Sequence, residues 1–158
     1  MRVTGFLTRV VYPAVGGAFG ILVMTAFGQV AHLPLMMVPF TTSIVLVMAT
    51  PLSLFARPRN ILGGHVLSAV AGFAVLWTLG SNPWMSAIAV GLAIALMQIS
   101  DTLHPPAGIN AFIIVMQAPD WSFFFVPVTA GAVMLVGVTW LFHKVTQPGV
   151  YPIRKKRE

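Results

Sequence analysis

The sequence predicts an all-helical integral membrane protein, and its composition, its charge spacing and its basic clusters are the three observations behind this prediction. Hydrophobic residues make up 58% of the 158 residues, charged residues make up 8%, and the mean hydropathy is +0.91. A soluble domain is about 25% charged. The net charge of +6 would indicate a nucleic-acid partner in a soluble protein. Here the bases flank apolar segments, so we expect the lipid bilayer, and no nucleic acid, as the partner.

Six apolar segments divide the chain, because polar and proline-rich positions interrupt its hydrophobic sequence five times. A helix needs about 20 apolar residues to cross a hydrocarbon core of about 30 Å. The segments are expected at roughly residues 10–30, 33–55, 61–79, 83–100, 105–118 and 121–143.

The first three segments each begin at a recognisable signal. Segment 10–30 has the form of a signal peptide, but we interpret its glycine-rich helix as a retained span because the repeat described below requires it. Segment 33–55 contains the proline-marked opening Pro39-Phe40-Thr41-Thr42-Ser43. Segment 61–79 follows Asn60, which is a good helix N-cap.

The last three segments are separated by prolines. Segment 83–100 follows the turn Gly80-Ser81-Asn82-Pro83. Segment 105–118 opens at His104-Pro105-Pro106 and offers about 14 helical residues, roughly 21 Å, which is too short to span alone. The uncharged stretch from Trp121 to His143 forms the sixth segment, 121–143.

Six crossings place every basic residue on one side of the membrane, which the positive-inside rule identifies as the cytoplasm. These residues are Arg2, Arg9, Arg57, Arg59, Lys144, Arg154, Lys155, Lys156 and Arg157. We therefore expect a single transmembrane domain over residues 1–146 and a basic cytoplasmic tail over 147–158. Both termini are expected in the cytoplasm, and the expected location is the bacterial inner membrane. A four-pass arrangement with two re-entrant segments also keeps both ends inside and ranks second.

The two halves of the chain resemble each other in segment order. A shift of 68 positions aligns Val47–Pro51 with Val115–Pro119 and Gly63 with Gly131. A unit of three crossings is odd in number, so the second copy enters from the opposite side and the sequence predicts two inverted repeats, about 10–79 and about 83–143. The second segment of each repeat is expected to be broken or re-entrant, which indicates a binding site near the midplane.

The two broken segments predict an anion site. Each half-helix start exposes unpaired amides and about half a positive charge, and two such starts would meet near the membrane centre. The expected substrate-binding residues are Thr41, Thr42, Ser43, Arg59, Asn60, His104, Pro105, Pro106, Ala107, Gly108 and Asn110, with the backbone amides of Thr42, Ser43, Ala107 and Gly108 holding the anion. Hydroxyl groups in membrane helices also often bond their own backbone, and Arg59 can equally serve as a topology signal.

Asp101 and His104 are the expected proton-coupling pair. They stand three residues apart, and a carboxylate can orient an imidazole and raise its pKa. Two alternatives are a cytoplasmic loop in which both the acid and the histidine are solvated, and an Asp101 that caps a helix end. No cofactor and no metal site is expected, and cysteine is absent, which excludes disulfides, thiolate ligands and cysteine nucleophiles. Phosphate loops, zinc motifs and serine-nucleophile elbows are also missing, so we expect no enzyme.

Two motifs make the chain resemble the HPP family of small integral membrane proteins. They are Pro58-Arg59-Asn60-Ile61-Leu62-Gly63-Gly64-His65 and His104-Pro105-Pro106-Ala107-Gly108, and the resemblance covers roughly residues 14 to 142. The family is often described with four membrane helices. Its plastid and cyanobacterial members are associated with nitrite transport, so the resemblance implies nitrite as the candidate substrate.

The expected function is therefore transport of a small inorganic anion, with nitrite as the candidate, through the site at the two half-helix starts. Two alternatives stay open. One is a passive channel for an anion or another small solute, and the other is a membrane scaffold or assembly protein without a ligand site. A chain of this length has little bulk to enclose a pathway, so we expect a homodimer or a trimer.

Overall fold

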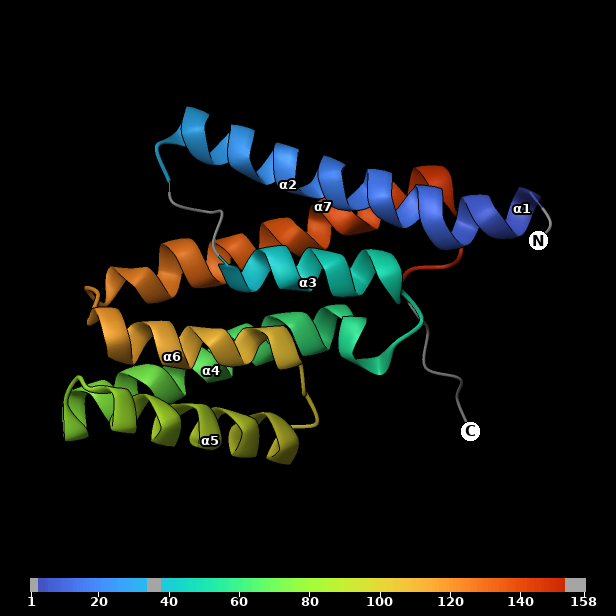
Figure 1. Cartoon of the computed structure of the whole chain (residues 1–158). Coiled ribbons are helices and arrows are strands. Elements are labelled where there is room, and N and C mark those ends of the chain that lie inside the picture. The colour runs from blue at the N-terminus through green and yellow to red at the C-terminus, as the bar shows by residue number, and fades with distance from the viewer. Residues whose placement is uncertain (1–2, 34–37, 153–158) are drawn as a thin grey trace.

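The computed structural model describes residues 3–33 and 38–152, and all regular structure within these ranges is helical (Figure 1). The helices of ten residues or more are α2 (Tyr12–Ala31), α3 (Val38–Ala49), α4 (Pro58–Leu79), α5 (Pro83–Ile99), α6 (Gly108–Gln117) and α7 (Gly131–Thr146). The all-helical class and the six predicted segments are thus confirmed at this level.

Short helical turns extend two of these helices. α1 (Val3–Phe6) and a π-helical stretch, Leu7–Val11, continue into α2, and a second π-helical stretch, Phe124–Ala130, continues into α7. Three continuous helices, Leu7–Ala31, Pro58–Leu79 and Phe124–Thr146, are long and apolar enough to cross a membrane.

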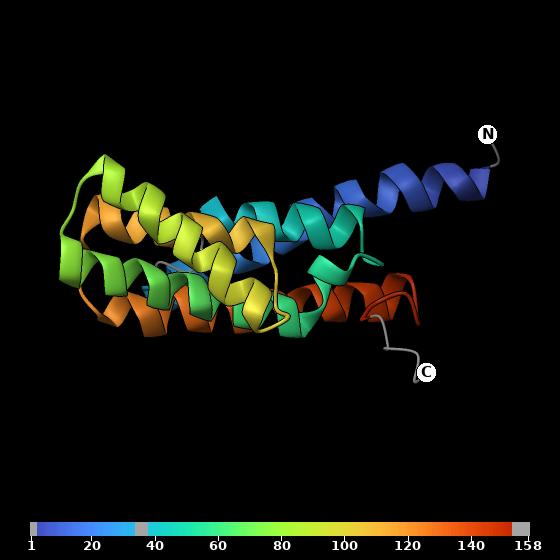
Figure 2. The same cartoon turned by 90° about the horizontal axis from the view of Figure 1, so that it is seen from below.

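Successive helices run in opposite directions, and the two views show them side by side in one elongated bundle (Figures 1 and 2). α4 packs against α5, α6 and α7, whereas α3 packs against α2 and α7. α1 and the chain beyond α7 lie at one end of the bundle, together with the connection between α3 and α4 (Figure 1). The connections α4–α5 and α6–α7 lie at the opposite end. The described basic residues belong to elements at the first end, in agreement with the predicted charge asymmetry.

α3 and α6 are about half as long as a membrane span. α3 has 12 residues and α6 has 10, which correspond to about 18 Å and about 15 Å. The predicted segment 33–55 was therefore too long at its end: α3 stops at Ala49 because Pro51 disfavours helix at the residue before it. The chain then forms a 3-10 turn, Leu54–Ala56, before α4. Residues 34–37 of that segment lie outside the described residues.

α4 begins three residues earlier than predicted. Pro58 occupies the first helical position, where its missing N–H and fixed φ are favourable, and extended Arg57 precedes it. Asn60 is consequently inside the first turn and is not the N-cap. Its side-chain amide donates instead to the Leu103 carbonyl at 3.0 Å, which fastens the α5–α6 connection to α4.

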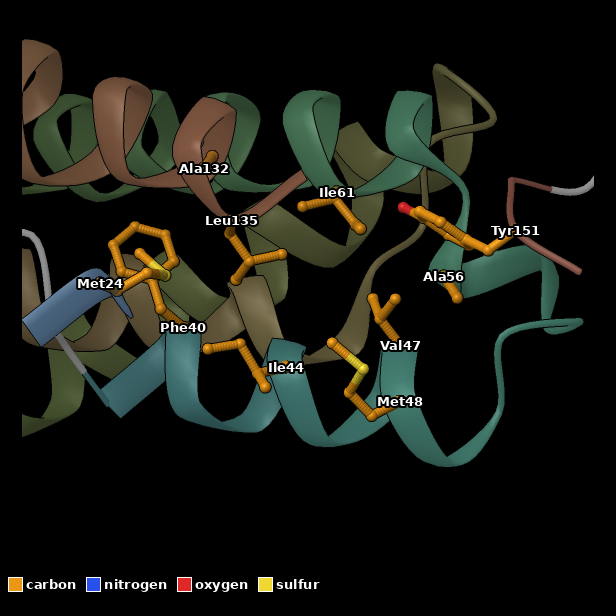
Figure 3. Close-up of a cluster of buried hydrophobic side chains, with 10 residues drawn as sticks. All are labelled: Met24, Phe40, Ile44, Val47, Met48, Ala56, Ile61, Ala132, Leu135 and Tyr151. Atoms are coloured by element: carbon orange, nitrogen blue, oxygen red, sulfur yellow. The ribbon is translucent and has the colours of Figure 1, made fainter. Parts of the chain in front are cut away.

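An apolar cluster between α2, α3, α4 and α7 forms one part of the hydrophobic core (Figure 3). Its buried members are Met24, Phe40, Ile44, Val47, Met48, Ala56, Ile61, Ala132, Leu135 and Tyr151. The ring of Phe40 packs on Gly131, where a Cβ atom would lie only 2.5 Å from a ring carbon. α3 can therefore approach α7 closely because residue 131 has no side chain.

Candidate functional site

Four polar side chains meet in the interior of the bundle: Ser43, His65, His104 and Asn110. Each has an exposed fraction of 0%. They come from α3, from α4, from the connection that follows α5, and from α6. Groups with hydrogen-bonding capacity at such depth are costly unless they are paired, and in a membrane protein they mark functional sites by default. We call these four residues the polar cluster.

Ser43 is the hub of the polar cluster. Its Oγ lies 2.7 Å from His104 Nε2 and 3.1 Å from His65 Nε2. The same hydroxyl is 2.8 Å from the Pro39 carbonyl one turn earlier in α3. One oxygen atom therefore links α3 to both histidines.

His104 is held by its backbone and by both of its ring nitrogens. It is extended (φ −138°, ψ 94°), as expected before a proline, and Pro105 and Pro106 start a 3-10 turn, Pro105–Ala107, that leads into α6. Its Nδ1 donates to the Phe55 carbonyl at 2.8 Å. Gly64 makes room for it, because a Cβ at residue 64 would lie 2.7 Å from the Cβ of His104.

His65 is positioned by Asn110 and by two rings. The Asn110 side-chain nitrogen donates to His65 Nδ1 at 2.9 Å and to the His65 carbonyl at 3.3 Å. The His65 ring centroid lies 4.8 Å from that of Phe40 and 5.3 Å from that of His104. The side-chain oxygen of Asn110 is buried without a hydrogen-bond donor. This is a vacant acceptor on the residue that holds the His65 imidazole.

Three of the predicted site residues, Ser43, His104 and Asn110, come together in this cluster. Thr41 is half-buried and Thr42 is exposed. The Thr42 hydroxyl donates to the Pro39 carbonyl of its own helix at 2.9 Å, which is the local bond that membrane hydroxyls commonly make.

The backbone amides predicted to hold an anion are already bonded, and this part of the predicted site is corrected. Thr42 and Ser43 are the fifth and sixth residues of α3, beyond the first turn whose amides are free. The 3-10 turn uses the other two: the Ala107 amide donates to the His104 carbonyl at 3.0 Å, and the Gly108 amide donates to the Pro105 carbonyl. Pro105 and Pro106 have no N–H to offer. Side chains, not helix amides, provide the polar groups here.

The predicted Asp101–His104 pair does not form, because a turn points the two side chains apart. Asp101 adopts φ 54° after α5, and the Thr102 amide donates to the Met97 carbonyl, which together make a Schellman motif. The Asp101 carboxylate is 87% exposed and lies 3.7 Å from the Arg59 guanidinium, whereas His104 is buried. The acid is solvated at a helix end, as the alternatives expected, but the solvated histidine of the loop alternative is wrong because His104 is buried.

Arg59 lies at the edge of the bundle and does not enter the cluster. Its side chain is 65% exposed and donates to the Ser100 carbonyl at 2.8 Å in addition to pairing with Asp101. Arg59 and Asn60 thus both fasten the α5–α6 connection to the beginning of α4.

His65 is the functional candidate that the sequence analysis did not select. It was quoted only as part of a family motif, although it is an ionisable residue inside a predicted span, which is itself a signal for function. A second polar contact was also missed: Ser68, one turn further along α4, accepts the Ala111 amide of α6 at 3.1 Å.

Tyr151 lies outside the spanning helices and packs against the same inner core (Figure 3). Its ring centroid is 5.2 Å from that of His143, and its exposed fraction is 4%. Burial raises the pKa of the Tyr151 hydroxyl to about 12. The chain beyond α7 is thereby fastened to the bundle by a neutral phenol.

A bundle of alternating helices with three membrane-length apolar members and a fully buried polar cluster defines an integral membrane protein. The sequence model described as "HPP, transmembrane region" matches residues 4–152. This chain therefore belongs to the HPP family, as its motifs indicated.

Two proteins of Dictyostelium discoideum, each described as a transmembrane protein, are similar to this chain. One is 34% identical over 131 residues, which cover 78% of this chain and 46% of the relative. The other is 34% identical over 122 residues, which cover 72% and 39% respectively. The chain thus spans less than half the length of these relatives. No solved structure matches it significantly.

Proposed function

We propose that this member of the HPP family transports a small inorganic anion across the membrane, with nitrite as the first candidate, and that the polar cluster is its binding site. The observation that carries the proposal is the complete burial of two histidines, a serine and an asparagine where α3 meets the start of α6. An intramembrane cluster of this kind is expensive, and transport is the function that most directly requires it.

The arrangement of the two short helices supports a transport site. α3 runs toward the end of the bundle with the basic residues, and α6 runs toward the other end (Figure 1). Discontinuous helices that meet near the midplane form substrate sites in transporters built from inverted repeats. We accordingly propose two inverted repeats, about 10–79 and about 83–143, with α3 and α6 as their broken second segments.

The side chains of the polar cluster supply the chemistry that the helix amides do not. Imidazole N–H, hydroxyl and amide groups donate hydrogen bonds to an oxyanion, and such bonds are strengthened in a dry interior. Arg59, exposed beside Asp101 at the edge of the bundle, raises the local concentration of anions without entering the site. In this proposal both termini face the cytoplasm and the protein resides in the bacterial inner membrane as a small homo-oligomer.

Uptake into proteoliposomes tests the proposal. The purified protein is reconstituted, and uptake of nitrite, nitrate, formate and chloride is compared between the parent, His104→Ala and Arg59→Ala. His143→Ala is the matched control, because His143 is also buried and also bonds a backbone carbonyl but lies outside the polar cluster. Thermal unfolding establishes that each variant is folded.

Saturable uptake of one anion, reduced about tenfold or more in His104→Ala and much less in the control, is the expected result. Arg59→Ala is expected to weaken uptake at low salt more than at high salt, because its contribution is a screened surface charge. Flux that never accumulates against a gradient identifies a passive channel instead. Failure of all four anions to enter or bind contradicts the anion proposal and favours the scaffold role.

A further inference from the structure

We infer that the Ser43 bridge is a binding site for one proton, held between His104 and His65, and that this proton crosses the membrane with the anion. The second half of this inference rests on the proposed function, whereas the first half concerns the cluster alone. Three steps carry it: the direction of each hydrogen bond, the number of hydrogens at Ser43, and the charges that surround the cluster.

The partners of the two rings determine which nitrogen carries hydrogen in each neutral histidine. The Phe55 carbonyl can only accept, so His104 carries its hydrogen on Nδ1 and presents a lone pair at Nε2 to Ser43. The Asn110 side-chain nitrogen also faces the His65 carbonyl, which can only accept, and this settles the orientation of the amide. His65 Nδ1 therefore accepts from Asn110, and His65 Nε2 carries the hydrogen and donates to Ser43.

The neutral cluster is one hydrogen short at Ser43. The hydroxyl has a single hydrogen, yet two acceptors lie within reach: His104 Nε2 at 2.7 Å and the Pro39 carbonyl at 2.8 Å. A proton added to His104 Nε2 removes the shortage. His104 and His65 then both donate to Ser43 Oγ, and the hydroxyl donates to Pro39, so that every group around the oxygen is satisfied.

The protonated cluster has no negative partner in the surrounding elements. α3 contributes Ser43, α6 contributes Asn110, and the turn before α4 contributes the Phe55 carbonyl. On α4, Arg59 points outward to Asp101. α7 contributes His143, which bonds the Thr139 carbonyl and packs on Tyr151 of the following segment. Within the described residues, neither ring of the cluster contacts a carboxylate.

An anion therefore supplies the missing charge. A lone positive charge in a dry interior is unfavourable, and so is a lone anion, but the two together form a neutral pair. The geometry thus predicts electroneutral movement of one proton with each anion.

Nitrogen NMR of the histidine rings tests the proton site without any transport. The chain has four histidines, and the signals are assigned with His65→Gln, His104→Gln and the control His143→Gln. At neutral pH His104 is expected to carry its hydrogen on Nδ1 and His65 on Nε2, and Ser43→Ala is expected to shift both signals while leaving that of His143 unchanged. A hydrogen on Nε2 of neutral His104, or a His104 signal indifferent to Ser43→Ala, overturns the proton site.

A pH-sensitive dye inside proteoliposomes tests the coupling. An inward nitrite gradient is expected to acidify the interior faster than in protein-free vesicles, which correct for passive entry of nitrous acid. His65→Gln and Ser43→Ala should lower this protein-dependent acidification about tenfold or more, whereas His143→Gln should not. Nitrite uptake by the parent without protein-dependent acidification overturns the coupling and leaves the proposed function standing. Expected NMR signals without anion uptake leave the proton site standing and contradict the proposed function.

Discussion

After α5, two residues separate the exposed carboxylate of Asp101 from the buried ring of His104. Asp101 takes the left-handed position of the helix end, Thr102 closes the turn, and His104 then enters the bundle. The spacing of an acid and a histidine three residues apart suggested a pair because it assumed one helical end. The sequence motif identified His104 correctly, but the partner of its ring depends on tertiary packing, and Ser43 lies 61 positions away in the chain.

Asp101→Asn is expected to leave anion uptake and its pH dependence within about twofold of the parent. The carboxylate is exposed, its ion pair with Arg59 is worth about 0 to 1 kcal/mol, and asparagine tolerates the left-handed conformation well. Uptake across a pH series checks this, with His104→Gln measured beside it. A pH profile of uptake that changes as much in Asp101→Asn as in His104→Gln would show that Asp101 takes part in proton coupling.

Tyr151 predicts a pH dependence at the alkaline extreme. Its folded pKa of about 12 lies above the unfolded value of about 10, so burial of the neutral phenol contributes stability that is complete below pH 10 and is lost as the pH rises through 12. A tyrosinate absorbance titration of the purified protein should contain a late phase that Tyr151→Phe removes. Ionisation of Tyr151 near pH 10 would show that the segment after α7 is not docked.

At the scale of elements, the prolines predicted where α5 begins and where the turn into α6 begins, but the helix ends were less predictable. α3 ends at Ala49 and α4 begins at Pro58, because proline acts on the residue before it and also suits a first turn. The predicted anion site at the start of α6 is wrong for a related reason. The amides of Ala107 and Gly108 are hydrogen-bonded within a 3-10 turn, whereas a helix that began directly would leave them free. No local pattern distinguishes these two kinds of start.

Close packing of α4 on α6 makes Gly72 a test of how α6 is positioned. A Cβ atom there would lie 3.0 Å from the Cα of Ala111, so Gly72→Val must push the backbone of α6 away. We expect a destabilisation of about 1–3 kcal/mol, which is typical of overpacking, and weaker anion uptake because Asn110 moves with α6. Thermal unfolding in detergent measures the first effect and proteoliposome uptake the second.

Gly91→Val is the matched control for this substitution. Gly91 is exposed on α5, and a Cβ at this residue has no neighbour within 4 Å. Equal loss of stability in the two valine variants would show that helix propensity, and not the α4–α6 contact, is the cause.

At the scale of the whole molecule, six segments and the charge asymmetry predicted the number and alternating direction of the helices (Figure 1). Hydropathy and basic clusters suffice for this because the bilayer imposes both. Neither pattern could show that His65 faces the cluster, since the helices are apolar on every side and the rotation of each one is set by contacts between distant segments.

Cysteine accessibility tests the predicted orientation in the membrane. The chain has no cysteine, so single replacements report without background. Ser81→Cys, between α4 and α5, should react with a membrane-impermeant thiol reagent applied to intact cells. Thr50→Cys, at the opposite end of the bundle after α3, should react only after permeabilisation; the reverse pattern would place both chain ends outside.

The shared hydroxyl of Ser43 also bears on the timing of any conformational cycle. Ser43 belongs to the first half of the chain and His104 to the second, so a rocking motion of one half against the other must break their contact. A neutral hydrogen bond contributes about 0.5–1.5 kcal/mol and one to a charged group about 1.5–3 kcal/mol. The contact between Ser43 and a protonated His104 would therefore hold the two halves together several-fold longer than the neutral contact. The lifetime of the state in which this contact is formed would then report whether His104 is protonated.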